Sequence, residues 1–459
     1  MVASSLVGAS TAFWPLGTAA AGAIALTLAA VAALARPLRP SPFSPVHLTV
    51  WLYLAVAAAT VSVYPAVADA PFGTAFRTTL PTDLLAATAL LYVLAAGSVL
   101  AGAACCLALT RGSGFGRRPV RLERIGSSEG AHTALLVVAL VPFALIFAGT
   151  AGDLGVLLNR TYYLASLQAN QQLFGFGANL ALAVTLLAGY VWSASTAWTK
   201  RATSVAVALL YFILFFSLGS RSLAMAPIVF AMGAYAASPT SKRLKTLLLI
   251  SVGVGLILLP LPLSLRLMDA HGLIPYLSNL APDSPAVDVG AASLLLNLLQ
   301  SVPTVAVTAF KEPALPLWVS LNPLPGNVAG WYAVSDAYRL NVNAPYPALG
   351  ELANRSVLVV ATYFAVAGFV LARTDLAIRR LMARGHQLYA LLLVAVSGLF
   401  AVFSLQYNLR TTTRFLYYLT ALTLLAAIVP RLLAAARGLY SRRYRTRHRE
   451  PGLTRPRGL

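Results

Sequence analysis

Six arginines beside apolar stretches are the residues best placed for chemistry: Arg160, Arg221, Arg266, Arg355, Arg410 and Arg414. A guanidinium group binds phosphate oxygens through paired N–H donors, so several of them together would hold a diphosphate. Arg221 follows Gly219 and Ser220 in a short turn between two apolar segments and precedes a helix start, where N–H groups and partial positive charge favour an anion. The alternative for each arginine is an interfacial role, with its stem in apolar surroundings and its charge at the lipid headgroups.

A proton acceptor would complement these cations. Glu351, in the segment 349–352, is the first candidate and His271 the second, because a carboxylate or an imidazole can take a proton from a hydroxyl group. Glu351 precedes Arg355 by four residues, so a simple ion pair on one helix face is the alternative. Further acidic candidates are Asp153, Asp269 and Asp336. The sequence shows no metal-ligand set, glycine-rich phosphate loop or catalytic serine motif, so neither a metal nor a cofactor is expected.

The composition decides where these residues must be held. The chain has 459 residues, of which 59% are hydrophobic and 10% charged, and its mean hydropathy is +0.77. A soluble domain of this length carries far more surface charge. Several apolar runs reach the roughly 20 residues that a membrane helix needs, and they are continuous rather than alternating. The sequence therefore predicts an all-α polytopic membrane protein.

The apolar runs divide the chain into about eleven transmembrane helices. We place them at 13–34, 46–67, 83–109, 132–149, 174–194, 202–218, 223–237, 246–265, 356–372, 388–405 and 415–433. Only residues 219–222 join the sixth and seventh, which predicts a helical hairpin, and Pro227 predicts a kink in the seventh. Residues 1–433 then form a single transmembrane domain, and residues 434–459 form a basic cytoplasmic tail.

A long polar segment, 266–355, separates the eighth and ninth predicted helices. It contains nearly half of the acidic residues of the chain, so we expect it to lie mostly in water on the outer face of the membrane. Within it, the uncharged stretch 289–302 is rich in leucine around Leu294 and predicts a helix on the membrane surface.

The distribution of basic residues predicts the orientation. Alternate loops and the tail hold 25 of the 34 Lys and Arg residues but only 4 of the 13 acidic residues. The positive-inside rule makes that face cytoplasmic, with the N-terminus outside and the C-terminus inside. The net charge of +21 then belongs to one membrane face, which argues against nucleic acid as a partner and for contact of the tail with anionic lipids. The six arginines lie on the opposite, outer face.

Three short motifs give the chain a resemblance to a known family. They are the proline-led segment 41–45, the turn Gly219-Ser220-Arg221, and the segment 345–352, which ends in Gly350-Glu351-Leu352. In these motifs and in its arrangement of spans the chain resembles the O-antigen polymerase class of oligosaccharide repeat unit polymerases. The resemblance implies a metal-independent, cofactor-free membrane glycosyltransferase that joins oligosaccharide repeat units carried on polyprenyl diphosphate, on the outer face of the cytoplasmic membrane. It also implies lipid-linked glycan donor and acceptor, with a chain-length regulator as a further partner.

The resemblance suggests roles for the candidate residues. Arg221 would bind the diphosphate together with Arg160, Arg266 or Arg410, and Arg355 and Arg414 would complete the set of cations. Glu351, or alternatively His271, would take the proton from the acceptor hydroxyl group. The helix around Leu294 would guide the prenyl chain.

Three other functions stay open at this point. One is an O-antigen ligase. Another is a prenyl-phosphate-sugar glycosyltransferase, a class that commonly has an acidic pair in the first outer loop, whereas Asp69 and Asp83 stand apart here. The third is a flippase or transporter for lipid-linked oligosaccharide. Transporters often carry ionisable residues in mid-span and show matched halves, but here the charges lie at span ends and no internal symmetry is visible.

Replacing Arg221 by Ala tests the expected diphosphate site. The variant should make shorter glycan or none, because one cation that offsets charge on the leaving diphosphate is lost. Glycan chain length is measured at matched protein levels. Long polymer of normal length would remove Arg221 from the mechanism.

Overall fold

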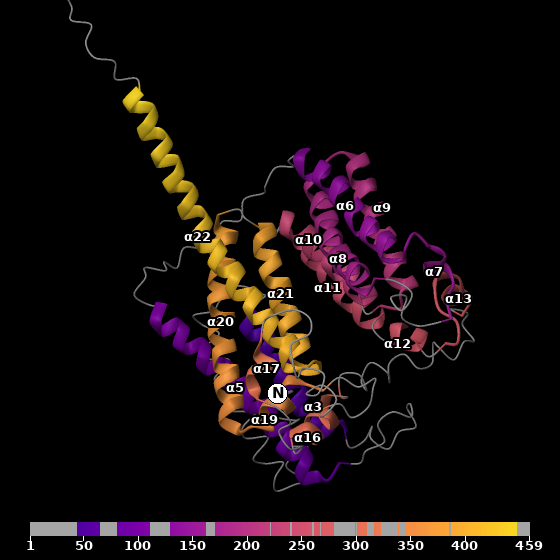
Figure 1. The fold of residues 1–459 in the computed structure, drawn as a ribbon, viewed down its shortest axis with the longest axis vertical. Helices are drawn as coiled ribbons and strands as arrows, with labels where there is room; N and C mark the ends of the chain where they lie inside the picture. Colours follow the sequence, from indigo (N-terminus) through magenta and orange to yellow (C-terminus); the bar gives the residue numbers. More distant parts are fainter. Residues whose placement is uncertain are drawn as a thin grey trace, which may run out of the picture.

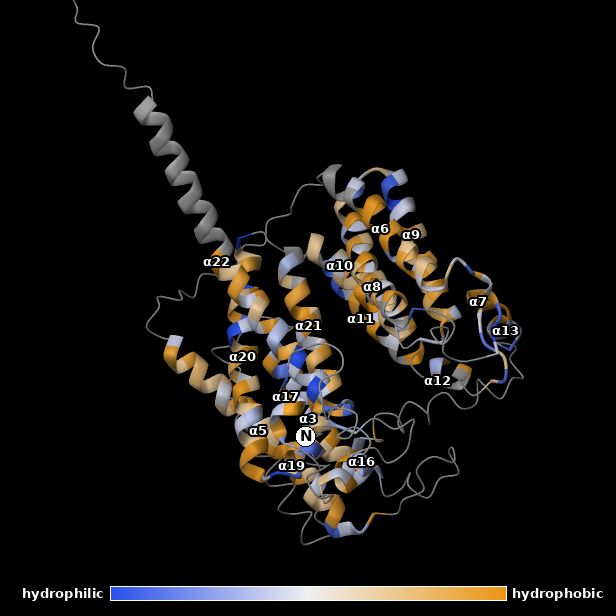
Figure 2. Ribbon diagram, in the orientation of Figure 1, coloured by the Kyte–Doolittle hydropathy of each residue, from blue (hydrophilic) through white to orange (hydrophobic). Residues whose placement is uncertain are grey.

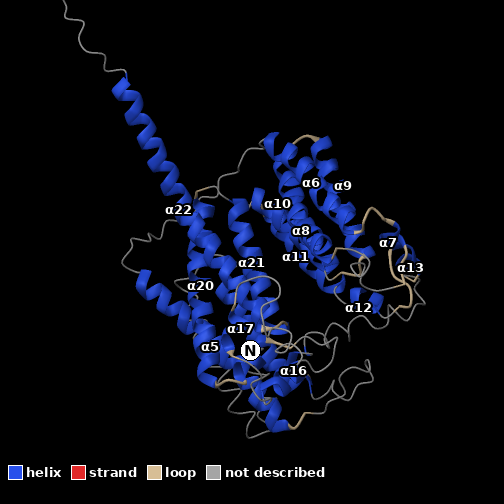
Figure 3. Cartoon of the chain, viewed as in Figure 1, coloured by secondary structure: helices blue, strands red, loops and turns tan. Residues whose placement is uncertain are grey.

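The computed structural model describes residues 44–64, 80–110, 129–161, 170–220, 222–238, 241–258, 261–266, 268–279, 299, 301–309, 316–322, 338, 346–384 and 387–447. In these ranges the regular structure is helical, as Figure 3 shows. Their only β pairing is an isolated bridge between Arg160 and His271. The all-α prediction is confirmed.

The helices fall into two length classes (Figure 1). The longer ones are α3 (Pro45–Ser62), α5 (Thr82–Thr110), α6 (Glu129–Gly149), α8 (Gln171–Ala194), α9 (Trp198–Ser217), α10 (Ser222–Ala237), α11 (Lys242–Leu258), α20 (Val357–Ala383), α21 (Gln387–Gln406) and α22 (Leu409–Arg447). The shorter ones are α7 (Gly155–Leu158), α12 (Leu261–Arg266), α13 (Leu273–Ser278), α16 (Ser301–Ala309), α17 (Leu317–Leu321) and α19 (Ala348–Ala353).

Five of the described helices are long and apolar enough to cross a membrane: α3, α5, α8 from Leu173 onwards, α9 and α20. Shorter apolar helices include α10 and parts of α6 and α21. Figure 2 shows hydrophobic residues along most of α6, α9 and α11. The chain is therefore a helical membrane protein. The total of eleven spans stays a prediction, and the first expected span, 13–34, lies outside the described residues.

The helices pack around two hydrophobic cores, which Figure 1 shows as two bundles. Helices α3, α5, α16, α19, α20, α21 and α22 build the first bundle. Helices α6, α8, α9, α10 and α11, with the short α7, α12 and α13, build the second. Helix α10 packs against α21, and Met232 contacts both cores. The first bundle thus joins helices from both ends of the described chain, since the N-terminal α3 contacts α20 and α21 near the C-terminal end.

The turn between α9 and α10 forms the predicted helical hairpin. Gly219 has a φ of 57°, the left-handed conformation that a glycine adopts without steric penalty. The N–H of Gly219 donates to the carbonyl of Phe216 at 2.9 Å, and the N–H of Ser220 donates to that of Phe215 at 3.0 Å. This pair of bonds is the Schellman ending of a helix, so Gly219 stops α9 and the chain can turn at once. Arg221 itself lies outside the described residues.

The long segment between α12 and α20 is described only in part, so the expected outer loop stays a prediction. Its helices α16 and α19 are buried in the first core, and Val302, Val305 and Ala306 have no exposed surface. The reason is local composition, because α16 is a short apolar helix that packs against α5 and α19. Most of the leucine-rich stretch 289–302 lies outside the described residues, so its surface helix stays a prediction.

Glycines let the backbones of neighbouring helices approach closely. A Cβ built on Gly102 of α5 would lie 1.8 Å from the carbonyl oxygen of Ala365, and one on Gly368 of α20 would lie 2.0 Å from that of Val99. Between α8 and α10, Gly189 and Gly233 make the same reciprocal contact, 1.9 Å from the nearest backbone oxygen in each case. Small residues at such crossings are the usual means of packing helices in a membrane, where apolar burial from water does not drive association.

Replacing Gly102 or Gly368 by Ala should destabilise the first bundle by about 1–3 kcal/mol, because the added methyl group meets rigid backbone. The measurement is the thermal unfolding midpoint of the purified protein in detergent. Gly253→Ala in α11 is the control, since nothing lies within 4 Å of its added Cβ. Equal midpoints for all three variants would contradict the close-packing account.

Candidate active site at the start of helix α22

Glu351 lies in the interior of the first bundle, with only 1% of its surface exposed. Helix α19 begins after Pro347, and the N–H of Ala348 donates to the carbonyl of Tyr407 at 2.8 Å. One turn later, Glu351 Oε2 accepts a hydrogen bond of 3.3 Å from the N–H of Leu409. The short helix therefore holds the carboxyl group against the first residue of α22.

The start of α22 is well suited to a carboxyl group. Asn408 caps the helix, because its side-chain oxygen accepts a hydrogen bond of 2.9 Å from the N–H of Thr411. The hydroxyl group of Thr413 donates back to the carbonyl of Leu409 at 2.7 Å. The unpaired N–H groups and partial positive charge of a helix N-terminus stabilise a negative group in this position.

Burial raises the pKa of Glu351 to about 7. Hydrogen bonds from the Ser320 hydroxyl group and the Leu409 N–H, and the positive charge of Arg355, oppose that rise. Both protonation states of the carboxyl group are therefore populated near neutral pH. This is the property that a proton-transfer group needs, and strongly shifted pKa values are typical of functional sites.

Three of the six predicted arginines lie on the elements that meet here. Arg355 follows Glu351 by four residues and is partly buried. Arg410 is the second residue of α22 and is 3% exposed, and Arg414 lies one turn further along the same helix face. Arg355 is near enough for its charge to act on the Glu351 carboxyl group, and Arg410 and Arg414 belong to the first two turns of α22.

Several hydroxyl groups join this region that the sequence analysis did not single out. The Tyr363 hydroxyl group of α20 lies 3.1 Å from the Thr413 hydroxyl group, and Tyr417 donates to the carbonyl of Leu321 at 2.7 Å. With Ser320, they place polar groups where α17, α19, α20 and α22 meet. Two signals were present in the sequence, namely a tyrosine inside the apolar run 356–372 and an asparagine directly before a helix.

Arg160 and His271 form a separate group in the second bundle. Their backbones exchange two hydrogen bonds of 2.8 Å, and Arg160 Nη1 donates to the carbonyl of Ser217 at 3.0 Å and to that of Val156 at 3.2 Å. The Ser217 hydroxyl group donates to the carbonyl of Leu157. These contacts join the end of α9 to the segments around α7 and α13. Since the last carbonyls of a helix lack partners within it, the Arg160 guanidinium group has a structural role there.

His271 is less suited than Glu351 to act as a base. Its Nδ1 lies 3.0 Å from the Tyr276 hydroxyl group. Burial, followed by the charge of Arg160, holds the pKa of His271 below its usual range, although a hydrogen bond with the Leu265 backbone and the charge of Asp269 oppose this. The lowered pKa favours the neutral imidazole, whose Nδ1 faces the Tyr276 hydroxyl group.

The structure therefore divides the predicted set. Figure 1 shows α7 and α13 in the second bundle, well apart from α19 in the first. Arg266 is the last residue of α12, and its side chain lies outside the description, as does the whole of Arg221. Within the described ranges, no three His, Cys, Asp or Glu side chains are arranged to hold a metal ion. Comparison of the chain with family models, with curated proteins and with solved structures finds no match.

Glu351 should make stability depend on pH. Its pKa of about 7 in the folded protein exceeds the ordinary 4.5, so between these values the folded state binds the proton more tightly than the unfolded state. The free energy of unfolding should then fall as pH rises through this window, by on the order of 3 kcal/mol from this group. Glu351→Gln should lose that slope, because the amide stays neutral.

The measurement is the thermal unfolding midpoint from pH 4.5 to pH 8, the first of these being the ordinary pKa of the group. Asp153→Asn serves as the control, because Asp153 is exposed and only caps a local turn through the Gly155 N–H. The control should keep the slope of the parent protein. If Glu351→Gln also keeps it, the carboxyl group is not protonated in the folded state.

Proposed function

We propose that this protein is a membrane glycosyltransferase that polymerises polyprenyl-diphosphate-linked oligosaccharide repeat units on the outer face of the cytoplasmic membrane. The observation that carries the proposal is the buried Glu351 carboxyl group, with its pKa near neutrality, held against the Leu409 N–H and acted on by the charge of Arg355. Arg410 and Arg414 follow in the first two turns of α22. One proton acceptor and several phosphate-binding cations are what this reaction requires of a protein.

In the proposed reaction, a hydroxyl oxygen of the acceptor glycan attacks the anomeric carbon of the donor glycan. The bond between that carbon and the diphosphate oxygen breaks, and polyprenyl diphosphate leaves with the bonding electron pair. The acceptor proton passes to the ionised Glu351 carboxylate, and the arginines offset the charge that develops on the diphosphate. The glycosidic bond formed replaces the phosphoester bond broken, so no metal or redox partner is needed.

The fixed position of Glu351 favours catalysis over transport. A transported substrate must pass its binding groups, whereas Glu351 is held in a short helix whose own backbone is tied to Tyr407. Positioned groups of this kind raise the rate of a proton transfer because little reorganisation is needed during the reaction. Of the two candidate bases we assign the role to Glu351, and we assign Arg160 and His271 to the joining of the outer segments.

The test is elongation of a defined lipid-linked oligosaccharide by the purified protein in liposomes. Glycan should lengthen, and Glu351→Gln should lower the rate by roughly 10²–10⁴-fold because the proton acceptor is lost. The rate should rise with pH with a midpoint near 7, since the ionised form of Glu351 is the active one.

Asp153→Asn is again the matched control and should elongate at the parent rate. Movement of substrate across the bilayer with no new glycosidic bond would replace the proposal by transport. Transfer of a single glycan without repetition would indicate a ligase.

A further inference from the structure

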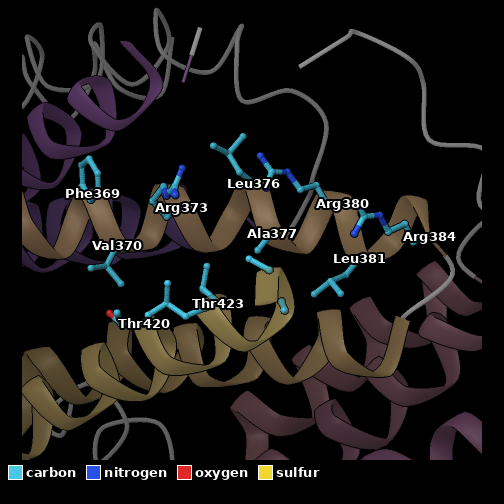
Figure 4. A pocket seen from close by; sticks show the side chains of 13 residues that line it. Phe369, Val370, Arg373, Leu376, Ala377, Arg380, Leu381, Arg384, Thr420 and Thr423 are labelled. Atoms are coloured by element: carbon cyan, nitrogen blue, oxygen red, sulfur yellow. The ribbon is translucent and has the colours of Figure 1, made fainter. Parts of the chain in front are cut away.

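A groove of about 730 Å³ lies between the C-terminal half of α20 and the middle of α22. Helix α19, which carries Glu351, precedes the N-terminal end of α20, so the groove lies towards the other end of α20 and is distinct from the candidate active site. Figure 4 shows the groove side chains, with α20 along one side and α22 along the other. Its lining combines a basic rim with an apolar floor.

The basic rim consists of Arg373, Arg380 and Arg384 of α20. Their spacing of seven and four residues places all three on one helix face, and all three are exposed. Arg379 points elsewhere and pairs with the buried Asp375 at 2.8 Å. The groove therefore has three guanidinium groups along one edge, and the one carboxylate of that helix is already paired on another face.

The floor of the groove is effectively apolar. It includes Val370, Ala377 and Leu381 of α20, which Figure 4 shows on the side of the helix that faces α22. Its two threonines use their hydroxyl groups within the protein, because Thr420 donates to the carbonyl of Leu416 at 2.8 Å and the Thr423 hydroxyl group lies 3.2 Å from that of Thr374. Figure 4 shows both threonines facing α20 across the groove. An occupant with hydrocarbon chains would lose no hydrogen bond by lying on this floor.

We propose that this groove binds an anionic phospholipid, with its phosphate on Arg373, Arg380 and Arg384 and an acyl chain along the apolar floor. Helix α20 is one of the candidate membrane spans, so its exposed face would border lipid. Several arginines on one face attract anionic headgroups, and free inorganic phosphate would leave the apolar floor unused. The inference does not depend on the proposed glycosyltransferase activity.

The test is native mass spectrometry of the purified full-length protein titrated with phosphatidylglycerol, and with phosphatidylcholine for comparison. The parent protein should retain phosphatidylglycerol preferentially. The triple variant Arg373→Gln, Arg380→Gln, Arg384→Gln should bind it more weakly by on the order of a hundredfold. Ala427→Trp, which fills the groove without changing charge, should also weaken binding.

The matched control is the triple variant Lys242→Gln, Arg243→Gln, Lys245→Gln. It removes the same charge from exposed positions at the start of α11. It should bind phosphatidylglycerol as the parent does, and excess inorganic phosphate should not displace the lipid. Equal weakening by both triple variants, unchanged binding by Ala427→Trp, or displacement by phosphate would each overturn the proposal. Thermal unfolding midpoints check that the variants are folded. The single variant Arg380→Gln is a milder substitution and should weaken phosphatidylglycerol binding about fivefold.

Discussion

The burial of one carboxyl group at the start of a long helix is the constraint on which the first bundle depends. Glu351 accepts a hydrogen bond from Leu409 and from Ser320, so it joins α19, α17 and α22. Burying a carboxylate without compensation is expensive, and the protein meets this with a helix N-terminus, two hydrogen bonds and a nearby guanidinium group. These interactions do not offset the effect of burial fully, so the pKa of Glu351 stays raised. The contact that joins the three helices therefore also sets the protonation state of the carboxyl group.

The surrounding helices make that burial feasible. Close backbone contacts through Gly102 and Gly368 bring α5 and α20 together, and α16 and α19 then fill the end of the bundle. Non-helical backbone is tolerated within a membrane protein only where protein covers it or a cavity hydrates it. Helix α19 begins after Pro347, and its first N–H donates to the carbonyl of Tyr407. The start of the helix that carries Glu351 is therefore covered by protein. The second bundle holds the segments around α7 and α13 differently, through the backbone bridge between Arg160 and His271.

Much of this arrangement follows from the sequence, but tertiary proximity does not. Continuous apolar runs predicted the helices, and Gly219 predicted the turn between α9 and α10, because those signals are local. The contact of Glu351 with the start of α22 was not predicted, and its proximity to Arg355 was expected only from their spacing of four residues. The sequence could not separate Arg160 and His271 from the other candidates, since all of them were predicted to lie on the same face of the membrane. It also missed Ser320 and Tyr363, whose importance depends on packing between distant helices.

The central claim is that the Glu351 carboxyl group is buried and exchanges its proton near neutral pH. Infrared difference spectroscopy tests this most directly, because a protonated carboxyl group has its own C=O stretching band. The spectrum of the parent protein minus that of Glu351→Gln should show this band at acidic pH and lose it with a midpoint near 7. A band that disappears around the ordinary pKa of 4.5 would show an exposed, ionised carboxylate and would contradict the account.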